Sequence, residues 1–185
     1  KTVQEANLLY WASSLMDFAY SAIALCVSNA DEPPPFTIPK LRFVHAGVTV
    51  SHDQASGTNI SNTCSIWRRY LVEEFIEDGL DGFTKFVHNG SANPLVDHND
   101  PRFKIAEFLC FVQHMQHFKT DGTVFVSNFQ GMCVLCLTHI PSKIAKGTNI
   151  FGEGNVGDVF EKFPEQHICN TYCKWFKLPV MHHTI

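Results

Sequence analysis

The spacing of apolar side chains predicts a mixture of helices and strands along this chain. Apolar residues that recur every three or four positions indicate helices, and short runs rich in valine, isoleucine and phenylalanine are typical of strands. The predicted helices cover residues 2–27, 101–118 and 154 or 155 to 163, with a last helix after Pro164. The predicted strands cover residues 41–50, 66–76, 83–88, 123–129 and 132–138, and the last two form a hairpin. Because the two kinds of element do not alternate regularly, we expect the α+β fold class.

Two of these helices carry more specific expectations. The helix over residues 2–27 is apolar around most of its circumference, so we expect it to be buried between other elements. The helix over residues 101–118 starts with Pro101 and has Asp100 as a candidate cap. Its expected apolar face consists of Ile105, Phe108, Leu109, Val112 and Met115. A turn is expected directly after it, at residues 120–122.

Composition places the chain among globular domains. Its 185 residues are 45% hydrophobic and 17% charged, which is enough for a packed core. No apolar run reaches the roughly 18 residues of a membrane span, and no Lys/Arg block points to nucleic acid, so we expect neither as a partner. The 7 cysteines favour free thiols over a disulfide framework, and hence the reducing cytoplasm. Because the chain starts at Lys1 and not at Met, we expect it to be a fragment of a longer protein.

The densest group of metal-binding side chains lies near the end of the chain, in His167-Ile-Cys-Asn-Thr-Tyr-Cys173. Cys169 and Cys173 are four residues apart, so on the predicted last helix they would share a face, with His167 at its start. Two sulfur ligands and one imidazole suit a tetrahedral zinc ion, whose fourth ligand must come from elsewhere in the chain. The alternative is a pair of buried thiols beside a capping histidine.

Several short segments carry a more specific pattern when taken together. In chain order they are Leu9-Tyr-Trp-Ala12, Tyr70-Leu-Val-Glu-Glu-Phe75, Phe83-Thr-Lys-Phe86, His114, Phe129-Gln-Gly131, Phe151-Gly-Glu-Gly-Asn-Val-Gly157 and His167-x-Cys-Asn-x-x-Cys173. This ordered set resembles the alpha-type (atypical) protein kinases. The resemblance implies one alpha-type kinase domain over residues 1–185, with a two-lobed kinase-like fold represented mostly by its C-terminal lobe. It also implies ATP-dependent phosphorylation of Ser or Thr in a protein substrate.

The resemblance supplies the missing zinc ligand. The first zinc histidine of the family lies on the helix before the Gln-Gly hairpin, and His114 matches that position. His167, Cys169 and Cys173 match the other three ligands of a structural zinc. Such a metal ion would couple its binding free energy to folding by fixing the last helix to the core.

The positions that match the family's phosphoryl-transfer residues are altered. Asn128 occupies the position of the Asp that serves the acceptor hydroxyl, and an amide cannot take up its proton. Gln130 matches the amide ligand of magnesium. His139 occupies the position of the family's second magnesium ligand, an Asp, and neutral imidazole is a poor ligand for Mg²⁺. We therefore expect little or no kinase activity from this chain.

The nucleotide side of the site is better matched. Glu74 corresponds to the hinge Glu that contacts the adenine amino group in the family. The glycine-rich loop corresponds to a family loop beside the active site, although a tight turn before a helix would show the same pattern. Its matching residues are Gly152, Gly154, Asn155 and Gly157.

The family's phosphate-binding Lys, on a strand before the first helix, has no match here, so we expect an N-terminally truncated kinase domain. The first alternative is a catalytically inactive pseudokinase that serves as a zinc-stabilised protein-binding module. The second is a small zinc-binding interaction domain unrelated to kinases.

Overall fold

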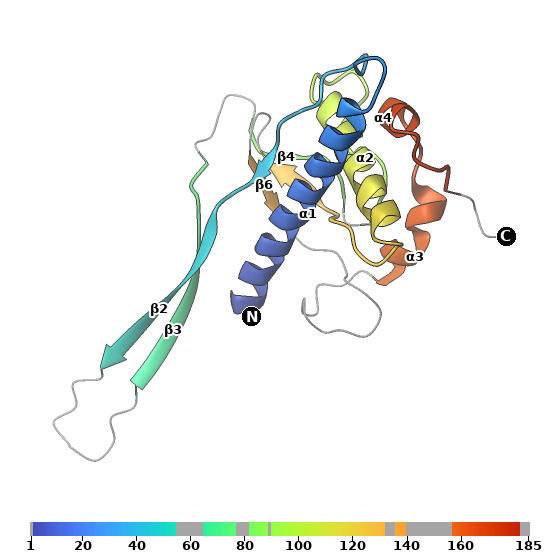
Figure 1. Cartoon of the computed structure of the whole chain (residues 1–185). Coiled ribbons are helices and arrows are strands. Elements are labelled where there is room, and N and C mark those ends of the chain that lie inside the picture. Colours follow the sequence, from blue (N-terminus) through green and yellow to red (C-terminus); the bar gives the residue numbers. More distant parts are fainter. Residues whose placement is uncertain are drawn as a thin grey trace.

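The computed structural model describes residues 2–54, 65–76, 82–88, 90–131, 136–139 and 157–181. Helices and strands are mixed, as the α+β prediction requires, and they form a helical part, a small sheet and a long two-stranded ribbon (Figure 1). The helices are α1 (Thr2–Ser28), α2 (Phe103–Lys119), α3 (Gly157–Gln166) and α4 (Thr171–Trp175). The strands are β1 (Arg42–Phe43), β2 (Ala46–Gln54), β3 (Ser65–Glu73), β4 (Thr84–Lys85), β5 (Phe129–Gly131) and β6 (Cys136–His139).

The small sheet has the strand order β1-β6-β5-β4. Strand β1 runs parallel to β6, whereas β6–β5 and β5–β4 are antiparallel. Strands β5 and β6 pair antiparallel as expected of a hairpin, but the predicted bounds are wrong: residues 130 and 131, expected at the turn, belong to β5, which begins at Phe129 and not at residue 123. The reason is that the backbone of Val126 bonds to side chains of α2: its N–H donates to Gln116 Oε1 and its carbonyl accepts from Gln113 Nε2.

The strand predicted over residues 41–50 is two strands in two different sheets. Strand β1 pairs with β6, whereas β2 pairs with β3 in the antiparallel ribbon that projects from the helical part (Figure 1). The chain changes sheets at Val44 and His45, and Val44 is buried at this crossing. The expected strand over residues 66–76 corresponds to β3, which ends at Glu73.

Helix α1 matches its predicted bounds to within one residue, but the expectation that it is buried between other elements holds for one face only. Its inner face packs on α2 and the sheet through residues such as Met16, Ala19 and Ile23. The opposite face is exposed because no described element covers it, and it carries Val3, Tyr10, Trp11, Phe18 and Leu25. By length and apolar composition alone α1 could cross a membrane, a test that core helices of globular domains also pass.

Helix α2 is the centre of the core, between α1 and α4 (Figure 1). The predicted apolar face is buried or half-buried. Over residues 108–116 the other sides of the helix are buried as well, including Cys110, Phe111 and Gln113. The helix starts at Phe103, two residues later than expected, because Asp100 Oδ1 accepts from the N–H of Arg102 and forms a turn before the first helical residue. The turn at residues 120–122 is confirmed, with the N–H of Gly122 bonded to the carbonyl of His117 at 2.7 Å.

Aromatic rings join α4 to this central helix. Phe111 of α2 stacks on Phe176 with ring centroids 4.8 Å apart, and Phe108 meets Tyr172 edge to face at 5.5 Å. Phe36, on the connector after α1, packs on Tyr172 at 4.4 Å. Aromatic contacts of this kind add to the free energy gained from area burial, so the short helix α4 is held mainly by its packing.

The side chain of Gln116 provides a test of this core. Its Nε2 donates to the carbonyl of Leu15 in α1 and its Oε1 accepts from Val126 N–H. We expect Gln116→Leu to lower the free energy of unfolding by about 1–3 kcal/mol, because the buried N–H of Val126 loses its partner and the link to α1 is lost. Gln4→Leu, the same change on an exposed position of α1, should alter it by less than about 0.5 kcal/mol. Urea denaturation measures the unfolding free energy of both variants. Equal midpoints would contradict the role of Gln116 in joining α1 to the segment before β5.

Candidate metal centre and nucleotide site

One side chain of α2 and three from a short segment near the end of the chain meet at the junction of α2, α3 and α4. They are His114, His167, Cys169 and Cys173, and their ligand atoms all lie within 4.8 Å of one another. His114 comes from the buried middle of α2, whereas the other three belong to the segment that follows α3. The structure thus brings together the four residues that sequence reasoning and resemblance assigned to zinc.

The local arrangement of this segment differs from the prediction. Cys169 and Cys173 were expected on one face of a helix, but α4 starts at Thr171, so only Cys173 is helical. His167 follows the end of α3, which continues through Pro164 to Gln166. The residue that caps α4 is Asn170, whose Oδ1 accepts from the N–H groups of Tyr172 and Cys173. Asn170 has an extended backbone, and α4 begins only after it, so Cys169 lies in the loop before the helix.

The donor geometry fits a tetrahedral zinc ion. The Sγ atom of Cys169 lies 3.8 Å from His114 Nδ1, and that of Cys173 lies 3.5 Å from His167 Nε2. With Zn–N about 2.05 Å and Zn–S about 2.3 Å, a nitrogen and a sulfur ligand of a tetrahedral site are about 3.6 Å apart. The cluster is shielded from water, since three of its residues are buried and Cys169 is half-buried. These four residues would therefore hold the ion without a water ligand, as in a structural site.

Burial favours the neutral form of the two histidines, which is the form that binds zinc. It lowers the pKa of His114 to about 3, with further repulsion from His167 and His117, and that of His167 to about 4. Both rings are therefore neutral at pH 7 and offer a lone pair. Burial raises the pKa of the Cys173 thiol to about 12, so this thiol needs a metal ion to become a thiolate.

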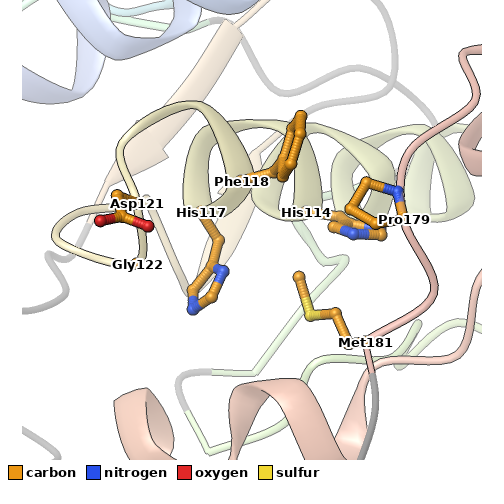
Figure 2. A pocket seen from close by; sticks show the side chains of 7 residues that line it. All are labelled: His114, His117, Phe118, Asp121, Gly122, Pro179 and Met181. Atoms are coloured by element: carbon orange, nitrogen blue, oxygen red, sulfur yellow. The ribbon is translucent and has the colours of Figure 1, made fainter.

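A small cavity lies beside the cluster on the side of α2. Its volume is about 250 Å³, below the roughly 300–1,000 Å³ of most ligand sites, so we assign no ligand to it. Figure 2 shows the side chain of His117 directed into this space from α2, with Met181 across from it. The complete lining is His114, His117, Phe118, Asp121, Gly122, Pro179 and Met181.

The residues assigned to phosphoryl transfer lie on the β5–β6 hairpin. Asn128 directly precedes β5, has a backbone φ of 61°, and is only 2% exposed. Its Oδ1 has no hydrogen-bond partner among the described residues. Gln130 pairs in register with Thr138, and His139 lies opposite Phe129 at the end of β6. The fold thus places the three positions on adjacent strands; the side chain of His139 lies outside the described atoms.

Glu74 is held by a partner that the sequence did not indicate. Both of its carboxylate oxygens bind the guanidinium of Arg42 at 2.7 Å, and Oε2 also accepts from the N–H of His45. The Arg42 hydrogen bonds, followed by the His45 bond, lower the pKa of this carboxyl to about 2. A carboxylate has about four lone-pair sites, so the remaining site for a further donor is on Oε1.

The glycine-rich loop is mostly outside the described residues. Gly152, Gly154 and Asn155 are not described, and Gly157 is the first residue of α3. The helix predicted from residue 154 or 155 to 163 is therefore present from Gly157 onwards, and it extends beyond its predicted end to Gln166.

Metal content tests the cluster directly. We expect one zinc per purified chain, and we expect Cys169→Ser to weaken zinc binding by more than about 100-fold and to destabilise the domain, because a lost ligand costs more than a lost outer-shell contact. Cys26→Ser changes a half-buried thiol of α1 outside the cluster and should keep the metal. Metal analysis and thermal melting provide the measurements. Well-folded wild-type protein without zinc would rule out the site.

Comparison with known proteins identifies a family. The model of the Alpha-kinase family matches residues 18–173, well over half of the chain. The matched range includes the four cluster residues, the β5–β6 hairpin and Glu74. None of the curated proteins matches the chain.

Proposed function

Because the chain belongs to the alpha-kinase family, we propose that it is a zinc-stabilised protein kinase domain that transfers phosphate from ATP to Ser or Thr, at a rate well below that of ordinary kinases. The observation that carries this proposal is the hairpin on which Asn128, Gln130 and His139 lie together. Protein kinases accelerate phosphoryl transfer by positioning the reactants and stabilising charge, so the neighbouring placement of these residues matters more than any single group.

Nucleotide recognition would use Glu74. The carboxylate accepts a hydrogen bond from the adenine amino group through the Oε1 position that Arg42 leaves available. Arg42 neutralises much of the charge of this carboxylate and fixes its orientation, so the contact is preorganised and weaker than one to a free carboxylate. Magnesium, when bound with ATP, supplies charge neutralisation at the phosphates, and Gln130 is the residue of this chain that would ligate it.

The low rate follows from the altered residues. The Oδ1 of Asn128 orients the acceptor hydroxyl but cannot remove its proton. An imidazole at position 139 supplies no hard oxygen ligand for Mg²⁺. The loss of one stabilising group at a reaction centre costs roughly 10²–10³ in rate, and losses within one site do not simply add. A domain that binds ATP and transfers phosphate slowly is the expected result, with a protein as the acceptor substrate.

Nucleotide binding is tested by thermal stabilisation. ATP at ten times its Kd stabilises the native state by about 1.4 kcal/mol, which for a chain of this size raises the Tm by about 3–6 °C. We expect this rise in the wild type and its loss in Glu74→Gln, which weakens the acceptor. Glu73→Gln is the matched control, because Glu73 is the exposed neighbour on β3. Each variant is compared with its own nucleotide-free Tm, since Glu74→Gln also weakens the ion pair with Arg42. Equal shifts in the two variants would remove Glu74 from the nucleotide site.

Catalysis is tested by restoring the carboxylates. We expect Asn128→Asp together with His139→Asp to raise phosphate transfer to a Ser/Thr peptide by at least about tenfold, because each change returns an oxygen donor of the family pattern. The comparison is made in the 185-residue chain and in a fusion that supplies an upstream strand with lysine. Gln130→Ala, purified identically, controls for contaminating kinases.

Two results would change the proposal. If the unaltered chain transfers phosphate at the roughly 1–100 per second of ordinary kinases, the roles given to Asn128 and His139 are wrong. If no variant, including the fusion, transfers phosphate at all, the domain is a pseudokinase that serves as a binding module.

A further inference from the structure

The loop over residues 90–94 is hydrogen-bonded to the segment that carries His167. The side chain of Asn93 donates from Nδ2 to the carbonyl of Gln166 at 2.9 Å, and its Oδ1 accepts from the N–H of Ile168 at 3.3 Å. One amide side chain therefore holds the backbone immediately before and immediately after His167. These contacts join positions 73 and 75 residues apart in the sequence.

The His167 ring needs such support because of the way it faces the cluster. Its Nε2 is the nitrogen near Cys173 Sγ, so Nε2 is the metal-binding atom and Nδ1 carries the proton. Nδ1 is buried and has no hydrogen-bond partner among the described residues, so the orientation of the ring depends on the backbone that carries it and on the side chains around it. Metal-bound histidines usually donate this second N–H to a carbonyl or carboxylate.

The loop itself is well anchored. Ala92 is fully buried and packs with Phe125 and Phe163, and the Phe163 ring stacks on His167 with centroids 5.4 Å apart. Within the loop, Ser91 Oγ accepts from the N–H of Asn93, and Pro94 forms a bridge with Val87. A rigid loop can fix the orientation of a ligand that it does not itself provide.

From these contacts we propose that Asn93 is an outer-shell residue of the metal site: its side-chain amide positions the backbone on both sides of His167. This inference rests on the metal site proposed above and does not depend on phosphoryl transfer. It also connects the metal site to the hairpin, because the N–H groups of Phe86 and Val87, just before the loop, bond to the carbonyl of Phe129 next to Asn128 and Gln130.

Asn is required at position 93 for a chemical reason. Its amide is both donor and acceptor, and the two neighbouring backbone groups are a carbonyl and an N–H. Leu at this position removes both hydrogen bonds while keeping a side chain of similar size. Asp keeps the bond to Ile168 but places a negative oxygen against the carbonyl of Gln166, so it should give an intermediate loss.

Zinc affinity, measured by competition with a chromogenic chelator, tests the proposal. We expect Asn93→Leu to bind zinc about 10–100-fold more weakly than the wild type, the usual cost of an outer-shell change, and Asn93→Asp to lie between them. The control Asn99→Leu alters an exposed asparagine of the same region and should bind zinc as the wild type does. If Asn93→Leu does not fold, the zinc affinity of Asn93→Asp is compared with that of Asn99→Leu, and equal affinities contradict the role of Asn93.

Cobalt substitution separates positioning from general destabilisation. The visible absorption of Co²⁺ reports ligand geometry, so we expect its bands to shift in intensity or position in Asn93→Leu. Gln116→Leu, which weakens the core without touching the His167 segment, should lower stability and leave the cobalt spectrum unchanged. The role of Asn93 would be overturned if Asn93→Leu left the zinc affinity and the cobalt spectrum unchanged, or if Gln116→Leu changed both in the same way. Neither result would affect the metal site itself. A wild-type chain that binds neither metal would overturn the metal site as well.

Discussion

The burial of the middle of α2, residues 108–116, on every side is the constraint on which the rest of this structure depends. A helix in such a position has no solvent-exposed face for its polar residues, yet it carries Gln113, His114 and Gln116 in its most buried turn. Each must find a partner inside the protein, because an unsatisfied buried polar group costs about 1–3 kcal/mol. The two glutamines bond to the backbone of α1 and of the segment before β5, and His114 faces the cysteine and histidine cluster. The polar residues of one helix thereby fix the positions of its neighbours on three sides.

The sequence was most informative where the signal was local or where several motifs agreed. The long first helix and the helix over α2 were predicted from periodicity, and the turn after α2 was predicted from its residue types. Resemblance identified the family and brought His114 to the other three cluster residues. The course of the last segment was predicted wrongly because the spacing of Cys169 and Cys173 fits a helix as well as a loop. Asn170 before an α-helical run is a recognisable cap signal, and it would have placed the start of α4 after Cys169.

Features that depend on distant partners could not be read from the chain. The break between β1 and β2 arises because the two strands pair with different partners, β6 and β3. The bidentate contact of Arg42 with Glu74 joins residues 32 positions apart. The late start of β5 reflects competition between side-chain amides and a strand partner for the same backbone groups. Asn93 is equally inconspicuous, because an asparagine in a polar loop usually indicates only a turn. In the last two cases side chains take over backbone hydrogen bonds, which hydrophobic periodicity does not register.

The position of α4 in the chain has a consequence for biosynthesis. Helix α2 leaves the ribosome about 50 residues before α4, which at 5–20 residues per second corresponds to roughly 3–10 seconds. During that interval Phe111 lacks its partner Phe176, and of the four metal ligands only His114 has been made. The apolar face of a nascent α2 is therefore open to aggregation until the last segment arrives. The contacts that cover this face are complete only after translation has passed Cys173 and Phe176.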